Sequence, residues 1–177
     1  IVIALFSLPA GAHAAGGAPF DVVDTKGHEG DEILFSKWNS FSRVAVYDRA
    51  HGDWSLSPRF TGPRGGSLFM DIDSAASTPI LEGTGDPADA AYLRYELTAL
   101  AYHLAERPAG FSALVIGPGG GRDLLSALAF GARQVDGVEI NPIIARDVML
   151  DRFRDYSGGV YAHPNVAIHV DDGRSFV

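Results

Sequence analysis

The feature that most constrains the fold is a glycine-rich turn that directly follows a short apolar run. Residues 113–116 are nearly all apolar, which predicts a strand buried on both faces of a parallel sheet. Residues 123–130 are rich in helix formers, and Gly131 is a suitable helix stop. Glycines lack Cβ, so they permit a tight turn and let a ligand approach the main chain. The turn holds four of them: Gly117, Gly119, Gly120 and Gly121.

An acidic residue near the end of the next predicted strand indicates that the glycine turn binds a nucleotide. Residues 134–140 predict that strand, and Glu139 lies near its end, about 20 residues beyond the glycines. In a nucleotide-binding unit, an acid at this position accepts hydrogen bonds from the two ribose hydroxyls. The alternative is a structural strand–helix–strand unit without a ligand, because any tight turn can use glycines.

A third predicted strand brings further acids to the same edge. Residues 165–170 alternate apolar with other side chains, and Asp171 and Asp172 follow them. The carboxyl ends of parallel strands meet at one edge, where open α/β sheets bind their ligands. The glycine turn, Glu139 and these two acids therefore predict one adenosine-shaped site.

Taken together, these motifs resemble those of a known group of enzymes. Residues 115–123 and 137–142 look like the first two motifs of class I S-adenosylmethionine-dependent transferases, with closest similarity to the spermidine synthase-like branch. Residues 171–176 look like that branch's third motif, and residues 34–44 look like the opening of its small N-terminal β domain. The resemblance implies an α/β, Rossmann-like class I methyltransferase fold, preceded by a small antiparallel β region. The sequence would hold only the first half of that fold, with three parallel strands.

The resemblance also implies the cofactor and the residues that bind it. The cofactor would be S-adenosylmethionine or decarboxylated S-adenosylmethionine. In the family the catalytic acid follows a fourth strand, which we expect beyond Val177, so the catalytic residue is unknown. The expected cofactor-binding residues are Gly117, Gly119, Gly120, Gly121, Asp123, Glu139, Asp172 and Gly173.

The stretch before the first parallel strand carries the candidate substrate residues. Asp86 and Pro87 are a suitable helix start, and residues 90–106 predict a helix with an apolar stripe. In spermidine synthases the matching helix carries a Tyr–His–Glu cluster that faces the polyamine. The alternative is a helix that packs its tyrosines on the sheet. The nearest matches to the cluster are Tyr92, Tyr95 and Glu96, and the stripe comprises Tyr92, Tyr95, Leu97, Leu100 and Leu104.

The residues around Gly120 bear on which reaction is catalysed. In spermidine synthases an acid that binds the donor's ammonium tail occupies the place matched by Gly120. Gly120, the backbone amides and Arg122 suit the carboxylate of intact S-adenosylmethionine better, which favours methyl transfer, although an inward-turned Asp123 would favour the ammonium tail. The alternatives are a polyamine aminopropyltransferase (spermidine synthase), a nicotinamide-dependent oxidoreductase and a non-catalytic nucleotide-binding module.

Composition argues against several other classes of function. The formal net charge of −8 is unsuited to a nucleic-acid groove, which needs clustered Lys and Arg. Cysteine is absent, so the sequence offers no disulfide framework, thiolate metal site or thiol nucleophile. The six histidines are scattered without metal-ligand spacing, which favours surface or packing roles and no metal site.

The pattern divides the chain into four segments. Residues 1–15 are apolar but shorter than the ~20 residues that cross a bilayer. They predict the end of a membrane segment, the end of a signal peptide or a soluble strand. Residues 16–32 are a glycine-rich linker, residues 33–82 a small β domain, and residues 83–177 the first half of the nucleotide-binding domain, which would be truncated here.

Two strands and two tryptophans characterise the predicted β domain. Residues 43–47 and 67–73 predict strands, and the Gly- and Pro-rich residues 48–66 predict a long loop between them. Trp38 and Trp54 predict anchors of the β region against the larger domain or walls of a substrate pocket.

The resemblance favours the membrane segment for residues 1–15, because adenosyl sulfonium cofactors are made in the cytosol. It implies a cytoplasmic domain attached to the inner membrane. The expected partners are a small-molecule acceptor such as a polyamine and a second copy of the chain in a homodimer, with no nucleic acid.

Overall fold

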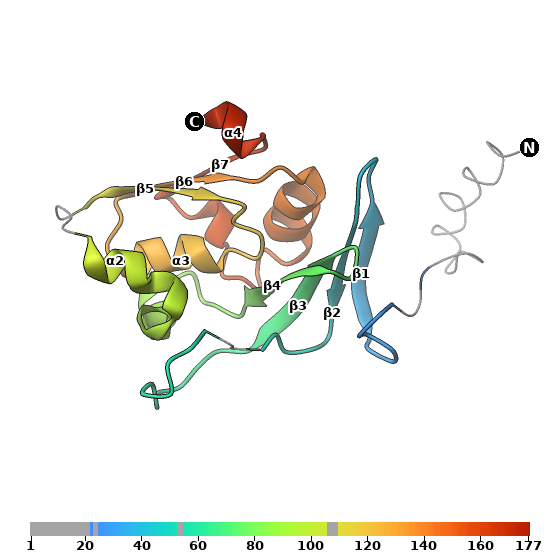
Figure 1. The fold of residues 1–177 in the computed structure, drawn as a ribbon, viewed down its shortest axis with the longest axis horizontal. Helices are drawn as coiled ribbons and strands as arrows, with labels where there is room; N and C mark the ends of the chain where they lie inside the picture. The colour runs from blue at the N-terminus through green and yellow to red at the C-terminus, as the bar shows by residue number, and fades with distance from the viewer. Residues whose placement is uncertain (1–21, 23–24, 53–54, 106–109) are drawn as a thin grey trace, which may run out of the picture.

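The computed structural model describes residues 22, 25–52, 55–105 and 110–177 of the 177-residue chain. Its strands form two sheets (Figure 1). The antiparallel sheet has the order β1-β2-β3-β4 and contains β1 (Ile33–Trp38), β2 (Arg43–Tyr47), β3 (Ser67–Ile72) and β4 (Ala76–Leu81). The parallel sheet has the order β5-β6-β7 and contains β5 (Ser112–Ile116), β6 (Gln134–Val138) and β7 (Val166–His169).

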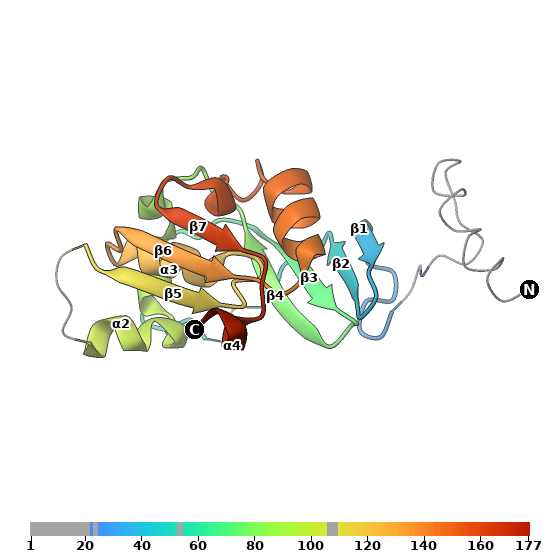
Figure 2. The ribbon, with the colours of Figure 1, turned by 90° about the horizontal axis from the view of Figure 1, so that it is seen from above.

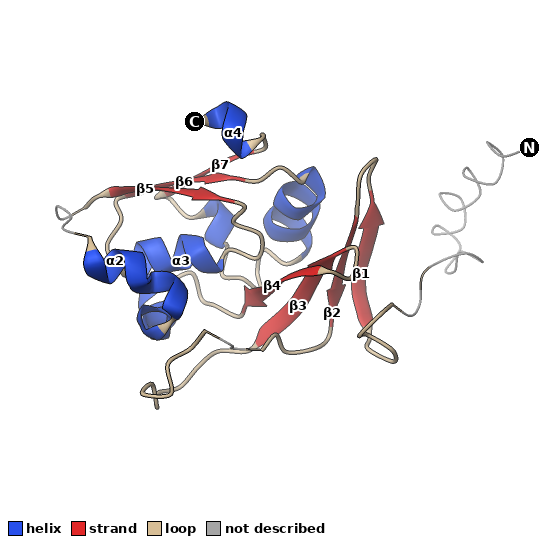
Figure 3. Ribbon diagram, in the orientation of Figure 1, coloured by secondary structure: helices blue, strands red, loops and turns tan. Residues whose placement is uncertain are grey.

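Short helices connect and cover these strands (Figure 3). An antiparallel region followed by strands and helices in alternation confirms the predicted Rossmann-like half and the β region before it. The helices before β5 are η1 (Pro87–Tyr95), η2 (Leu97–Ala99) and α2 (Leu100–Leu104). The helices after β5 are α3 (Arg122–Ala129), η3 (Ile143–Arg152), η4 (Val160–Ala162) and α4 (Gly173–Phe176).

The antiparallel sheet is covered on both faces, and all five residues of β2 are buried. On one side, the turn at residues 25–31 brings in His28, which is 5% exposed. Its ring stacks on Tyr47 with 3.9 Å between ring centroids, and its Nε2 lies 3.1 Å from Oδ2 of Asp71. His28 is therefore a packing histidine, one of the two roles expected of histidines in this sequence.

The strand–turn–helix–strand unit forms at the predicted place. Helix α3 begins and ends one residue before the predicted bounds. Gly131 takes a left-handed φ of +87° and donates its N–H to the Leu128 carbonyl at 2.8 Å, which ends the helix as expected. β5 and β6 pair in parallel, with Val115 beside Gly137.

The prediction that β5 is buried on both faces is wrong. Val115 lies in the core with Leu124 of α3, but Leu114 is 46% exposed and Ile116 is 59% exposed. The reason is that α3 covers one face, while in the described part of the chain the short α4 lies over the other (Figure 1). The apolar run reflects the composition of a buried strand, but only alternate side chains are enclosed.

The predicted helix over residues 90–106 is not continuous. Asp86 begins it as expected, because its carboxylate accepts the Ala88 N–H at 2.8 Å. The chain then becomes extended at Glu96, with ψ of 150°. Three short helices, η1, η2 and α2, therefore replace one long helix, and α2 ends at Leu104.

Pairing with a distant segment accounts for the break. The Ser57 N–H donates to the Tyr95 carbonyl and the Leu97 N–H to the Ser55 carbonyl, each at 2.9 Å. These bonds require an extended backbone, so the regular apolar stripe does not form. Tyr92 is buried, but the rest of the stripe is exposed: Tyr95 by 50%, Leu97 by 60%, Leu100 by 46% and Leu104 by 75%.

The two sheets meet where the parallel strands end. Figure 2 shows the arrowheads of β5, β6 and β7 pointing toward the antiparallel sheet. Gly120 approaches β4 so closely that an added Cβ would lie 1.9 Å from the Pro79 carbonyl oxygen. Buried residues of both sheets, such as Met70 of β3 and Val115 of β5, belong to one continuous hydrophobic core with Leu124 of α3.

Across the described ranges, no helix has both the length and the apolar character needed to cross a bilayer. Residues 1–15, which carry the predicted membrane segment, lie outside those ranges.

The contact between Gly120 and Pro79 predicts a specific sensitivity to substitution. We expect Gly120→Ala to lower the free energy of unfolding by roughly 3 kcal/mol, since overpacking against rigid backbone forces the sheets apart. Gly52→Ala is the matched control, because a Cβ there meets nothing within 4 Å. It should change stability by less than about 0.5 kcal/mol. Equal denaturant midpoints for the two variants would contradict the close approach.

Candidate functional site

The glycine turn adopts backbone angles that favour glycine at three positions. Gly117, Gly119 and Gly121 have φ of +69°, +52° and +89°, in the left-handed region. The Gly117 N–H donates to the Val138 carbonyl at 2.8 Å, so the turn begins at the sheet edge beside the end of β6. Gly120 is required for a different reason, namely its contact with Pro79.

Glu139 follows β6 directly and reaches back to this turn. Its side chain is buried, with 4% exposed. Oε2 accepts the Gly119 N–H at 3.1 Å, and Oε1 accepts the Asn141 N–H at 2.9 Å. The carboxylate thus holds the two strand tips together, and the sequence prediction that Glu139 faces the glycine turn agrees with this geometry.

Burial dominates the electrostatics of Glu139. Desolvation raises the pKa of its carboxyl, and the hydrogen bonds from Asn141, Gly119 and Ile140 only partly oppose that rise. A carboxylate has about four lone-pair sites, and three backbone donors leave one of them for a ligand.

Sequence reasoning missed Tyr161, which belongs to the same cluster. Its hydroxyl donates to the Gly119 carbonyl at 2.8 Å, and the residue is 3% exposed. Burial, with the nearby charge of Glu139, raises the pKa of this phenol far above its usual range. Tyr161 therefore stays a neutral donor that supports the turn. No local pattern marks it, because the contact spans 42 residues of sequence.

Asp172 and Gly173 follow β7, the third parallel strand. Oδ1 of Asp172 accepts the N–H groups of Arg174 and Ser175 at 2.9 and 3.3 Å, which begins α4. An added Cβ at Gly173 would lie 2.5 Å from Cγ2 of Ile116, so this loop packs on the end of β5. The Asp172 carboxylate is 39% exposed and faces a more open surface than Glu139.

Asp123 lies in the first turn of α3, beyond the glycines. Its side chain is 43% exposed, and Oδ1 is 3.4 Å from Nε of Arg122. The same guanidinium nitrogen lies 3.8 Å from Oε2 of Glu96. Arg122 is therefore shared between two carboxylates.

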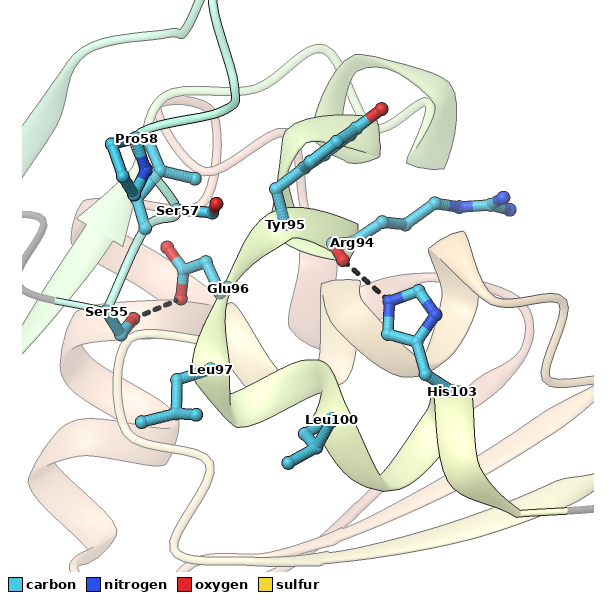
Figure 4. Close-up of a pocket in the computed structure, with 10 residues that line it drawn as sticks. Ser55, Ser57, Pro58, Arg94, Tyr95, Glu96, Leu97, Leu100 and His103 are labelled. Atoms are coloured by element: carbon cyan, nitrogen blue, oxygen red, sulfur yellow. Dashed lines mark hydrogen bonds between the residues drawn. The ribbon is translucent and has the colours of Figure 1, made fainter.

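The predicted substrate residues are only partly brought together. Tyr95 and Glu96 line an open groove of about 700 Å³ (Figure 4). Glu96 is 7% exposed and accepts the Ser55 hydroxyl at 3.0 Å. Tyr92 is buried outside this groove, and its ring packs against Phe60, which also contacts Tyr95. The groove is lined by Ser55, Leu56, Ser57, Pro58, Arg94, Tyr95, Glu96, Leu97, Leu100 and His103.

Arg122 connects the groove to the glycine turn. It is the first residue of α3, directly after Gly121, and its guanidinium approaches Glu96. The guanidinium of Arg122 therefore separates the groove from the glycine turn.

Within the described residues, no three His, Asp or Glu side chains are grouped so that they could hold a metal ion.

Comparisons with known proteins rest on structure rather than on sequence. No protein-family model matches the sequence, and no curated protein matches it. A spermidine synthase crystallised with the transition-state analogue AdoDATO is similar at 15% identity with a TM-score of 0.50. The spermidine synthase from Thermotoga maritima is similar at 14% identity with a TM-score of 0.52. Each match covers 81% of this chain and 42% of the synthase.

A third structure is more distant. It is the SAM-dependent methyltransferase from Agrobacterium tumefaciens, with 17% identity and a TM-score of 0.31 over 72% of this chain. The two synthases alone establish the fold, and the chain spans less than half of their length. Over the part that it covers, the chain has the fold of the spermidine synthases.

The raised pKa of Glu139 predicts how stability depends on pH. A carboxyl with a raised folded-state pKa contributes stability below its unfolded-chain pKa, about 4.3, and loses it as pH rises through the folded value. Glu139→Gln cannot ionise, so the variant should gain stability relative to the natural chain between about pH 4 and pH 7. Denaturant unfolding at both pH values measures the difference, with Glu32→Gln at an exposed glutamate as control. A relative gain by the natural chain over the same interval would contradict the dominance of burial.

Proposed function

We propose that the chain binds S-adenosylmethionine at the carboxyl edge of its parallel sheet and that its protein transfers the methyl group to a small-molecule acceptor. The observation that carries the proposal is the buried carboxylate of Glu139, which reaches the Gly119 amide at 3.1 Å. A carboxylate beside a glycine turn is the arrangement that binds the ribose of a nucleoside.

The residues present fit an adenosyl group. An added Cβ at Gly117 would meet nothing within 4 Å, so the turn is open there to a ligand. The remaining lone pair of Glu139 would accept a ribose hydroxyl, and Asp172 would bind near the base. When bound, the sulfonium supplies the electrophilic carbon. The protein's part is to hold that carbon in line with the acceptor and to exclude water.

Gly120 supports the intact cofactor over the decarboxylated one. In the family that the chain resembles, an acid at this place binds the ammonium tail of decarboxylated S-adenosylmethionine. Here any side chain at position 120 would collide with the Pro79 carbonyl oxygen. Arg122 gives less support than the sequence led us to expect, because it is shared between Glu96 and Asp123.

A second candidate is aminopropyl transfer to a polyamine. One observation favours it: Glu96 is a buried carboxylate in an open groove next to the start of α3. A carboxylate there, with the half-exposed ring of Tyr95, would suit a flexible cationic acceptor. The pairing of Glu96 with Arg122 reduces that negative charge, so we place methyl transfer first.

Calorimetric titration of the chain with S-adenosylmethionine and with its decarboxylated form tests the proposal. We expect tighter binding of the intact form. Glu139→Ala should weaken it by about 1–3 kcal/mol, the scale of lost hydrogen bonds to a charged group. Glu32→Ala, at an exposed glutamate on the antiparallel region, is the matched control and should leave the affinity unchanged.

The other outcomes are equally informative. Tighter binding of the decarboxylated form would replace methyl transfer with aminopropyl transfer. Binding of neither form, or full affinity in a folded Glu139→Ala variant, would reject the adenosyl site at this edge.

A further inference from the structure

A ring of three side-chain hydrogen bonds joins the two sheets beside Glu139. Asn39 Nδ2 donates to Asn141 Oδ1 at 3.0 Å, and Asn141 Nδ2 donates to Ser42 Oγ at 3.0 Å. Ser42 Oγ in turn donates to Asn39 Oδ1 at 3.3 Å, which closes the ring. Asn39 and Ser42 lie in the turn between β1 and β2, about 100 residues before Asn141.

Two of the three ring members are buried, and Asn39 is partly buried. Asn141 is 1% exposed and Ser42 is 5% exposed. Asn141 Oδ1 also accepts the Ile143 N–H at 3.1 Å, so the amide side chain fixes the start of η3 as well. A buried polar network with all members paired specifies one geometry, whereas losing one member leaves a buried group without a partner.

The backbone of Asn141 transmits that geometry to Glu139. Its N–H donates to Glu139 Oε1 at 2.9 Å, and the opposite oxygen accepts the Gly119 N–H. Whatever fixes the Asn141 peptide therefore fixes one of the backbone donors that orient the buried carboxylate.

We propose that Asn39 and Ser42 are positioning residues for Glu139, through which the antiparallel sheet sets the geometry of the nucleoside site. The inference rests on the proposed function for its consequence in binding, but the ring itself acts on Glu139 with or without a ligand. The β1–β2 turn thus helps to orient Glu139 through Asn141, and its role is indirect.

A polar link between β1 and η3 is weaker. Lys37 Nζ lies 2.8 Å from Oδ1 of Asp147 in η3, but both side chains are substantially exposed, at 50% and 35%. Exposed ion pairs contribute little, typically below about 1 kcal/mol. Trp38, expected to anchor the β region against the larger domain or to line a substrate pocket, is 61% exposed, and Asn39 beside it makes the contact between the sheets. Trp54, the other tryptophan of that prediction, lies outside the described residues.

Ser42→Ala is the sharpest test, because it opens the ring without changing charge. The turn keeps the Phe41 and Ser42 N–H bonds to Asn39 Oδ1, at 3.0 and 2.9 Å, so its local structure is retained. Ser40→Ala is the matched control, since Ser40 is exposed in the same turn and outside the ring. Two readouts are compared: calorimetric affinity for S-adenosylmethionine, and the pH titration of the Glu139 carboxyl carbon followed by NMR.

We expect Ser42→Ala to weaken the affinity about five- to ten-fold, the scale of one misplaced hydrogen bond. The pKa of Glu139 should rise further in the variant, because the Asn141 amide is one of the bonds that lower it. Ser40→Ala should change neither. A Glu139 titration that is the same in both folded variants would overturn the positioning role. If the natural chain binds no S-adenosylmethionine, the proposed function fails, while the ligand-free titration still decides this inference.

Asn39→Asp provides a second route if Ser42→Ala does not fold. It keeps the oxygen that caps the turn but replaces the donor to Asn141 with a carboxylate. At neutral pH this carboxylate cannot donate to Asn141 Oδ1. The affinity at pH 7 should therefore fall about five- to ten-fold, and an affinity equal to that of the natural chain in a folded variant would contradict the ring's role.

Discussion

The buried carboxylate of Glu139 is the interaction on which the rest of the site depends. It accepts N–H groups from the glycine turn after β5 and from the segment after β6, so it draws two strand tips together. Through Asn141, it is also tied to the turn of the antiparallel sheet. An ionisable group costs free energy to bury, and the raised pKa of Glu139 is the sign of that cost. Buried carboxylates with a raised pKa are frequent at functional sites, which is the reason the proposed function is built on Glu139.

Two further contacts hold the glycine turn. The Tyr161 hydroxyl donates to the carbonyl of Gly119, and Gly120 packs directly on the backbone of β4. The glycine turn is therefore defined by contacts on several sides before any ligand arrives. Preorganisation of this kind lowers the entropy that binding must otherwise remove. The groove around Glu96 is more open than the glycine turn.

The sequence predicted the elements whose causes are local. The glycine turn, α3, Gly131 and the three parallel strands follow from apolar runs, helix formers and residues without Cβ, and all are confirmed. The expected cofactor residues cluster at one sheet edge, and their role in binding stays a prediction. The break at Glu96 was missed because it depends on pairing with residues 55–57, which no periodicity reveals.

Other features of the site could not be predicted from the sequence, because they also depend on contacts between distant residues. Tyr161 and the ring of Asn39, Ser42 and Asn141 are contacts across 42 to 102 residues of sequence. The steric role of Gly120 requires knowing that Pro79 lies against it. The half-exposed face of β5 was missed because composition indicates a strand's apolar character but not which elements cover it.

The most direct test of the account is a titration of the isotope-labelled chain with S-adenosylmethionine, observed through the backbone amide signals. The account predicts that the largest shifts fall on Gly119, Asn141 and the residues around Asp172, since these amides surround the expected nucleoside. Shifts confined to the groove around Glu96, or no shifts at saturating ligand, would contradict an adenosyl site built on Glu139.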